Sequence, residues 1–232
     1  PGLGYTQPMQ KSGNTSSRSG NATRSLSNAD SHREEQLRLL LDLSNVVNSA
    51  TDVGVALNKA LQLMAEHLHM MRGAITLISP NSGEIRIEAA YGLKPAEARR
   101  GRYVRGEGIT GRVLATGQPA IVQDIDAEPL FLARAVERSQ LPPETVAFIA
   151  LPIEVNNAPI GVLACHRIRS RQRHLNDDLA VLRVLATLVG QLLQLEALVA
   201  DQTRQLEARN AVLANALNTK SARYGLIGSS PP

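Results

Sequence analysis

The spacing of apolar side chains predicts two amphipathic helices before the first strand. Over residues 31–34 the sequence SHRE matches the capping box that often begins a helix. A helical pattern follows it, and a second helix is expected over about residues 52–68. The side chains expected to face inward are Leu37, Leu40, Leu41, Ser44 and Val47 in the first helix, and Val55, Leu57, Leu61 and Met64 in the second.

The pattern then changes to that of strands. GAITLISP and EIRIEAAYG read as strands joined by a turn at residues 80–83, and the second alternates apolar with charged side chains. VAFIALPIEV and PIGVLACHRI form a hairpin across residues 156–158. Because these strands do not alternate one-to-one with helices, we expect an α+β fold, with a central antiparallel sheet and helices packed on one side.

The last element is predicted as a long helix that runs from near residue 176 to about Leu217. Within it, apolar residues recur every seven positions, at Leu185, Leu192, Val199, Leu206 and Leu213. The complementary heptad positions are Val189, Glu196, Thr203, Asn210 and Leu217. Asn at such a position sets the register of a coiled coil at a cost in stability. Before about Leu195 the helix is expected to pack on its own domain, and beyond it to form a parallel dimeric coiled coil.

The sequence GEGITG at residues 106–111 spells the G-x-G-x-x-G pattern of dinucleotide-binding turns. Such a turn follows a buried strand and opens a full crossover helix. Here the preceding sequence EARRGRYVR is too charged for a buried strand, and the helix expected over Ile109–Thr116 has only about two turns. We therefore interpret the glycines as backbone hinges that begin this short helix, with Gly117 ending it.

Composition narrows the classes of function. The net charge of +4 suits nucleic acid, but aromatic residues make up only 3 % of the chain, so stacking platforms are few. The single cysteine, Cys165, excludes an intrachain disulfide and a multi-cysteine metal site. No apolar run reaches a membrane span and no signal peptide opens the chain, so a cytoplasmic protein without membrane contact is expected. Residues 1–30, rich in Ser, Asn and Gly, are expected to be a disordered tail.

Signatures of catalysis do not emerge. The sequence contains no phosphate-binding loop, no H-E-x-x-H motif, and no nucleophile with an obvious base, so no catalytic residue and no metal ligand is assigned. Cys165-His166 matches the dipeptide that covalent bilin chromophores use. On a strand, however, the two side chains point to opposite faces, and a small apolar Cys within GVLAC is expected to be core packing.

Three segments carry a resemblance to a known family: GRYVRGEGITGRVLATGQPAIVQDIDAEPLFLAR, FIALPIEVNNAPIGVLACHR and LNDDLAVLRVLATLVGQLLQ. They resemble the amino-terminal GAF domain of Nif-specific regulatory proteins, which are sigma-54-dependent activators of nitrogen-fixation genes. The terminal RYGLIGSSPP resembles the junction at which their AAA+ ATPase domain begins. The resemblance implies a tail over 1–30, a GAF sensor over 31–194, a coiled-coil linker over 195–218 and the start of the ATPase over 219–232.

The resemblance implies a homodimeric sensor that needs no cofactor and has no enzymatic activity of its own. Sensors of this group respond to 2-oxoglutarate, to PII-type signal proteins or to an anti-activator, and reach sigma-54 RNA polymerase and DNA only through domains absent here. A ligand would lie between the sheet and the loops around the short helix, where arginines suit an anionic metabolite. The candidate ligand-binding residues are Tyr91, Arg102, Arg105, Arg112, Phe131, Arg134, Ile149 and Cys165.

Two alternatives remain open from the sequence. One is a GAF module that binds proteins and has no small-molecule ligand. The other is a GAF-type free methionine sulfoxide reductase, an activity that generally needs more than one cysteine for thiol exchange.

Overall fold

The computed structural model describes residues 34, 37–46, 49, 52–79, 82–169 and 175–223, with the side chains of the last segment described over 178–216. The predicted tail and most of the predicted capping box lie outside these residues. Helical residues 37–46 come first. The elements that follow are α2 (Val53–Leu68), β1 (Arg72–Ile78), β2 (Ile85–Tyr91), α3 (Pro95–Arg100), β3 (Arg102–Tyr103), α4 (Gly108–Thr116), β4 (Ala120–Val122), a 3-10 turn (Arg138–Gln140), β5 (Val146–Val155), β6 (Ala158–Ile168) and α5 (Leu175–Arg223).

The strands form one six-stranded sheet in the order β3-β2-β1-β6-β5-β4, with every neighbouring pair antiparallel. The predicted β5–β6 hairpin is confirmed, and Asn156 and Asn157 at its turn both have positive φ, 51° and 61°. Two successive left-handed residues match the tight hairpin turn that asparagine favours. The first and last long strands, β1 and β6, therefore lie side by side in the middle of the sheet.

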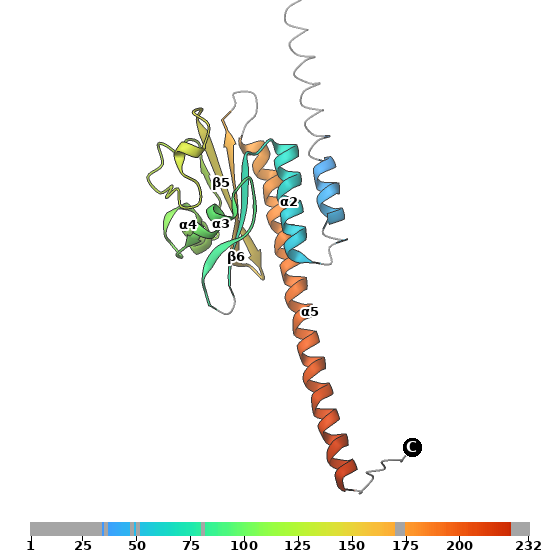
Figure 1. The fold of residues 1–232 in the computed structure, drawn as a ribbon. Helices are drawn as coiled ribbons and strands as arrows, with labels where there is room; N and C mark the ends of the chain where they lie inside the picture. The colour runs from blue at the N-terminus through green and yellow to red at the C-terminus, as the bar shows by residue number, and fades with distance from the viewer. Residues whose placement is uncertain are drawn as a thin grey trace, which may run out of the picture.

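Helices cover both faces of the sheet, where one covered face was expected (Figure 1). α2 and α5 pack on one face, together with the helix at residues 37–46, and bury a core that includes Leu61, Ile75 and Leu163. α4 and the segment that leads to β5 pack on the other face over a second core, which includes Leu114, Val146 and Val162. The sequence pattern missed this second layer because α4 is short and the rest of its cover has no regular period.

The inward faces of the first helices differ in part from the prediction. In the helix at residues 37–46, Leu39 and Leu43 are buried. Of the residues predicted to face inward, Leu40 is half-buried, Leu37, Leu41 and Ser44 are exposed, and Val47 lies outside the described residues. In α2, the predicted Leu57, Leu61 and Met64 are buried and Val55 is exposed. Five of the seven residues at 37–43 are leucine, so local periodicity could not select one face, and packing against α2 and α5 decides it.

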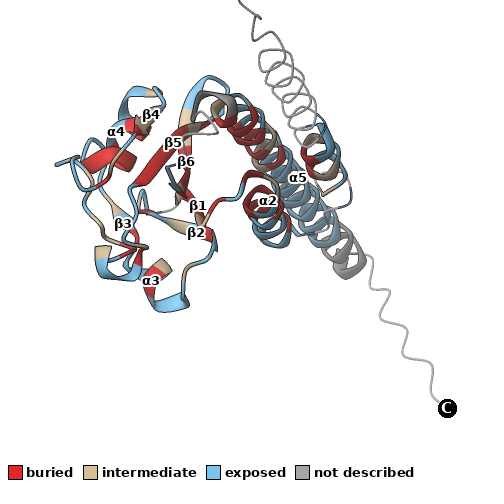
Figure 2. Cartoon of the chain, turned by 90° about the horizontal axis from the view of Figure 1, so that it is seen from above, coloured by how far each residue is buried: buried red, intermediate tan, exposed pale blue. Residues whose placement is uncertain are grey.

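α5 begins on the sheet and leaves it near the β5–β6 turn. A side chain on Gly190 would collide with the backbone carbonyl of Glu154 in β5, so glycine permits a close approach of the helix to the sheet. Four residues later, Gln194 Nε2 donates a hydrogen bond to Asn156 Oδ1 at 3.2 Å. Beyond this contact the described side chains of α5 are exposed, and the helix projects away from the domain (Figures 1 and 2).

By length and composition alone, the stretch Asp178–Ala216 of α5 would be apolar enough to cross a membrane. Nearly half of its most apolar window, 44 %, is buried inside the domain. Core helices of globular domains pass the same test, so the stretch is weak evidence for a membrane span.

Candidate functional site

A pocket lies on the α4 face of the sheet. It is bounded by the first turn of α4, by the segment at residues 130–136, and by side chains of β3, β5 and β6. The space between its walls, counted together with the open solvent at its mouth, is about 400 Å³. The lining residues are Tyr103, Gly108, Ile109, Thr110, Leu130, Phe131, Leu132, Ala133, Arg134, Ala135, Val136, Phe148 and His166.

The GEGITG segment shapes the α4 side of this pocket. Gly106 and Gly108 have φ of 86° and 62°, in the left-handed region that favours glycine. A side chain on Gly111 would collide with the carbonyl of Val104, so only glycine lets the preceding turn fold back on α4. Gly117 ends the helix in the left-handed conformation, with its N–H bonded to Val113 O. The interpretation of these glycines as backbone hinges that begin a two-turn helix is therefore confirmed.

Three aromatic rings in the lining of the pocket contact one another. The Phe148 and His166 ring centroids are 4.9 Å apart, and Phe131 lies edge-on to both, at 5.3 Å from Phe148 and 5.7 Å from His166. Phe148 and His166 are direct partners across β5 and β6, so the sheet sets their spacing. The result is a wall of ring edges and faces that suits a flat or apolar group.

His166 also carries the pocket's least satisfied polar atom. Its Nε2 is shielded from solvent and has no hydrogen-bond partner among the described residues, which is rare for a buried polar atom. Burial, with a smaller contribution from the charge of Arg72, lowers the pKa of His166 from 6.5 to about 4. The imidazole is therefore neutral at pH 7 and offers one nitrogen as a donor or an acceptor.

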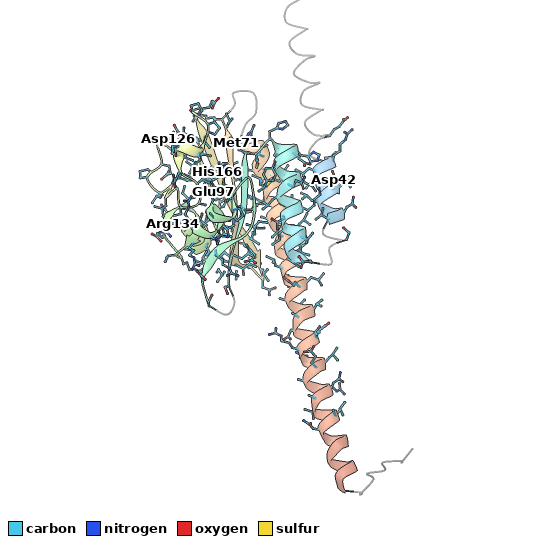
Figure 3. The ribbon with its side chains drawn as sticks, in the orientation of Figure 1. Asp42, Met71, Glu97, Asp126, Arg134 and His166 are labelled. Atoms are coloured by element: carbon cyan, nitrogen blue, oxygen red, sulfur yellow. The ribbon has the colours of Figure 1, made fainter. Side chains whose placement is uncertain are left out.

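Other polar side chains that line the pocket already have partners within the domain. Arg134 and His166 are both labelled in Figure 3. The Arg134 guanidinium pairs with the Glu107 carboxylate and donates to Arg102 O at 2.7 Å. Burial raises the pKa of the Tyr103 hydroxyl, an effect that the charge of Arg134 and a hydrogen bond with Thr110 partly offset. These contacts fix the rim of the pocket and leave little of the Arg134 charge uncompensated.

The structure brings together at this pocket two of the predicted ligand residues, Phe131 and Arg134. Arg102 pairs with Glu84, and Arg105 and Arg112 are exposed. The other predicted wall residues lie elsewhere: Tyr91 is exposed at the end of β2, whereas Ile149 and Cys165 belong to the core on the opposite face of the sheet. Ligand binding by any of these side chains stays a prediction.

Sequence reasoning missed the residues that give the pocket its character, namely Tyr103, Thr110, Phe148 and His166. One signal for His166 was available, since neighbours on a strand face opposite ways. Cys165 does face the α2–α5 core while His166 faces the pocket, as that rule requires. What the pattern could not tell was which of the two faces would hold a cavity.

Cys165 lies in an environment that suppresses thiol chemistry. It is buried, and desolvation raises its pKa to about 12 despite the nearby charge of Arg167. The reactive form of cysteine is the thiolate, so this side chain behaves as a small apolar core residue. Within the described part of the chain, no group of three or more His, Cys, Asp or Glu side chains is placed to hold a metal ion.

The predicted coiled-coil positions are buried where α5 packs on the domain and exposed beyond it. Leu185 and Leu192 are buried in the core beneath the sheet. Val199, Leu206 and Leu213 are more than half exposed, and Asn210 is exposed among them. The heptad pattern therefore continues from a covered face of α5 onto an uncovered one.

A family profile fits this architecture. Residues 52–193 match the GAF domain, which is more than half of the chain. The chain therefore belongs to the GAF domain family, as its resemblance predicted. The family match ends where α5 leaves the sheet.

Comparison with curated proteins gives a narrower group. The chain is 34 % identical over 201 residues to "Nitrogen fixation protein VnfA" of Azotobacter vinelandii, covering 86 % of this chain and 38 % of that protein. It is 33 % identical over 196 residues to the "Nif-specific regulatory protein" of Herbaspirillum seropedicae, covering 84 % and 36 % respectively. The chain thus spans little more than a third of the length of these relatives, and its similarity to them fits a regulatory role.

Solved structures share the fold at lower sequence identity. The "nlh2 gaf domain in an inactive state" of A. Aeolicus superposes with a TM-score of 0.63 at 20 % identity, covering 71 % of this chain and 99 % of that one. A free methionine-R-sulfoxide reductase from Neisseria meningitidis, in complex with its substrate, gives a TM-score of 0.57 at 21 % identity, covering 68 % and 88 %. At such identities these likenesses establish the fold alone.

Proposed function

We propose that this chain is the sensor segment of a sigma-54-dependent transcriptional activator of the Nif-specific type, acting in the cytoplasm. In this proposal it binds a small effector or a signalling protein and controls a downstream ATPase through a dimeric coiled coil. The observation that carries the proposal is the course of α5, which starts in the core of the domain and ends in an exposed apolar stripe. A sensor needs such a continuous element to connect its site with an output domain.

The exposed part of α5 supports a second copy of this chain as its partner. Val199, Leu206 and Leu213 repeat at seven-residue intervals, and Asn210 takes the complementary position at which Asn favours a dimer in fixed register. Glu196 and Thr203, at two further complementary positions, are polar and weaken the seam. A weakened seam changes more easily between two packing states, which suits a switch.

The proposed dimer is tested by sedimentation equilibrium of the chain and two matched variants. Leu206→Asp places a charge in the seam, whereas Ala208→Asp places the same charge on the outer face of the helix. We expect the first substitution to shift the chain to monomers and the second to leave it dimeric, with the same circular dichroism for both. Equal association of the two variants would contradict the coiled coil.

The identity of the signal separates the sensor from its nearest alternative, a GAF module that binds only proteins. Candidate signals are a small metabolite such as 2-oxoglutarate, a PII-type signal protein and an anti-activator. Calorimetry of the chain with 2-oxoglutarate, cyclic nucleotides and a wider metabolite panel tests the first class. Heat from one of them supports a metabolite sensor, whereas none from any favours the interaction module.

A methionine sulfoxide reductase is the less favoured alternative. Cys165 is the only cysteine in the chain, and burial raises its pKa to about 12. Thiol exchange requires an accessible thiolate and a resolving thiol. A purified domain that is inactive in a thiol-coupled assay is the expected result.

A further inference from the structure

Three large apolar side chains are exposed beside α4. Val104 is 60 % exposed, Leu130 is 37 % exposed and Leu132 is 42 % exposed. They come from two segments that both touch this helix, since a side chain on Gly111 would collide with the Val104 carbonyl and one on Gly108 with the Leu132 side chain. Neighbouring apolar side chains left in solvent mark an interaction surface, whereas a single one carries no such meaning.

Two arginines without partners lie next to these side chains. Arg105 and Arg112 are exposed, and neither guanidinium has an ion pair or a hydrogen bond among the described residues. The fold brings their backbones together, because Gly106 N–H donates to Gly111 O at 2.8 Å and each of these glycines directly neighbours one arginine. We call the five residues Val104, Arg105, Arg112, Leu130 and Leu132 the α4 surface.

The carboxylates on the same segments are engaged elsewhere. Glu107 pairs with Arg134, and Glu128 Oε1 accepts a hydrogen bond from Leu130 N–H at 3.0 Å. The two positive charges of the α4 surface are therefore not compensated by these neighbours. A guanidinium offers paired donors that match the two oxygens of a carboxylate, so the chemistry that complements this surface is acidic.

The combination of aliphatic side chains with two arginines favours a protein over other anionic partners. Lipid-binding clusters carry roughly four to eight basic residues, and the α4 surface has two. Single-stranded nucleic acid binds by stacking its bases on aromatic side chains, and none of the five side chains is aromatic. Protein interfaces have an apolar centre within a polar rim and are enriched in arginine, which is the composition found here.

We propose that the α4 surface docks a partner protein through a segment that presents carboxylates beside aliphatic side chains. The carboxylates pair with Arg105 and Arg112, while the aliphatic side chains cover Val104, Leu130 and Leu132. The inference rests on the proposed sensor function, in which a signalling protein is one class of signal, and assigns that protein its site and its chemistry. The surface lies on the side of the domain opposite α2 and α5, so a docked protein and the proposed coiled coil do not compete (Figure 2).

Docking is tested with a synthetic helical peptide in which pairs of glutamates alternate with pairs of leucines. Methyl NMR of the whole chain should show that this peptide shifts the signals of Val104, Leu130 and Leu132. Arg105→Glu with Arg112→Glu should weaken peptide binding at least about tenfold, because two attractive charges become repulsive. Val104→Ser should weaken it several-fold without changing the charge. All three substituted positions are exposed, so the fold is retained.

A matched variant and a second peptide keep the test specific. Arg38→Glu with Arg183→Glu makes the same change of charge at exposed arginines in the helical layer and should leave peptide binding unchanged. The same peptide with lysine in place of each glutamate should not bind. Absence of methyl shifts, equal binding of the two peptides, or full binding by the Arg105→Glu, Arg112→Glu variant would overturn the proposal.

Two further probes separate a protein from the other anionic partners. An oligothymidylate or phosphatidylserine vesicles that bind more tightly than the glutamate peptide, and lose binding in the Arg105→Glu, Arg112→Glu variant, would assign the surface to that partner and overturn the protein. Weaker binding of both supports the protein. Failure of the peptide to bind leaves dimerisation of the chain unaffected, whereas a chain that stays monomeric contradicts the sensor proposal whatever the peptide does.

Discussion

Arg167 of β6 and Asp178 of α5 form an ion pair that is almost completely buried, with 5 % and 0 % of the two residues exposed. Arg167 directly follows His166, and the two side chains point to opposite faces of the sheet. One short stretch of β6 therefore contacts the pocket on one side and the beginning of α5 on the other.

Because the ion pair is buried, we expect a single substitution to destabilise the domain much more than a double substitution that removes both charges. Asp178→Asn removes a buried carboxylate that pairs with Arg167, which should lower the free energy of unfolding by about 3–5 kcal/mol. The double variant Arg167→Met with Asp178→Leu removes both charges and should recover most of that loss. Urea unfolding measures both. A single variant as stable as the parent chain would contradict the burial of the pair.

His166 predicts a loss of stability in mild acid. Its pKa is about 4 in the folded chain and near 6.5 when unfolded, so below pH 6.5 the unfolded state binds a proton that the folded state does not. The contribution of His166 to the free energy of unfolding is therefore fully present above pH 6.5. It is lost as the pH falls to 4, by up to about 3 kcal/mol. Denaturant titrations at several pH values measure this slope. His166→Gln should flatten it.

Adding a single methyl group at Gly111 should lower the stability of the domain. In Gly111→Ala the added carbon meets the carbonyl of Val104, so either α4 or the preceding turn must move, at a cost of about 1–3 kcal/mol. Gly54→Ala in α2 is the matched control, since its nearest neighbour is the Asp52 carboxylate at 3.3 Å and the gain in helix propensity offsets it. Thermal unfolding compares the two variants. Equal melting temperatures would argue against the close approach at Gly111.

Cys165 predicts that thiol reagents label only the unfolded chain. Its burial and its pKa near 12 leave almost no thiolate in the folded domain at pH 8. Iodoacetamide labelling, followed by mass spectrometry, should be negligible without denaturant and should rise along the unfolding transition. Rapid labelling of the native chain would place the thiol at the surface instead.

If the polar heptad positions allow the proposed coiled coil to change its packing, apolar side chains there should hold a full-length protein that carries this segment in one signalling state. Thr203→Leu with Asn210→Leu makes two exposed polar positions apolar, which should stabilise one packing of the coiled coil. Transcription from a dependent promoter should then stop responding to the signal. A control with leucines at the outer positions Arg204 and Ala211 should respond normally. Normal regulation in the Thr203→Leu, Asn210→Leu variant would contradict a role of the coiled coil in signalling.

The parts of the fold that local chemistry determines were predictable from the sequence. Gly117 was expected to end a short helix beginning near Ile109, and α4 runs over Gly108–Thr116 with Gly117 in the left-handed conformation. The asparagine hairpin between β5 and β6 and the start of α2 near Asp52 were likewise found as expected. Each depends on residues close together in the sequence, so pattern and structure agree.

The pocket depends on distant segments and was predictable only in part. Arginines near the short helix were chosen for their charge, yet Arg102 and Arg134 are held by Glu84 and Glu107. The wall at residues 130–136 has no helical or strand period, and its position is set by packing on α4 and β6. His166 is a site residue because β5 and β6 align it with Phe148, a relationship that a linear pattern does not contain.

The close approach of Gly190 to Glu154 makes the domain surface a pivot for α5. From that point to Arg223 the helix extends about 50 Å at 1.5 Å per residue. A tilt of only about 5° at the pivot moves its far end by roughly 4 Å, which approaches the rise of one helical turn. The length of α5 beyond the sheet thus multiplies a small change of angle at the domain into a displacement of several ångströms at its far end.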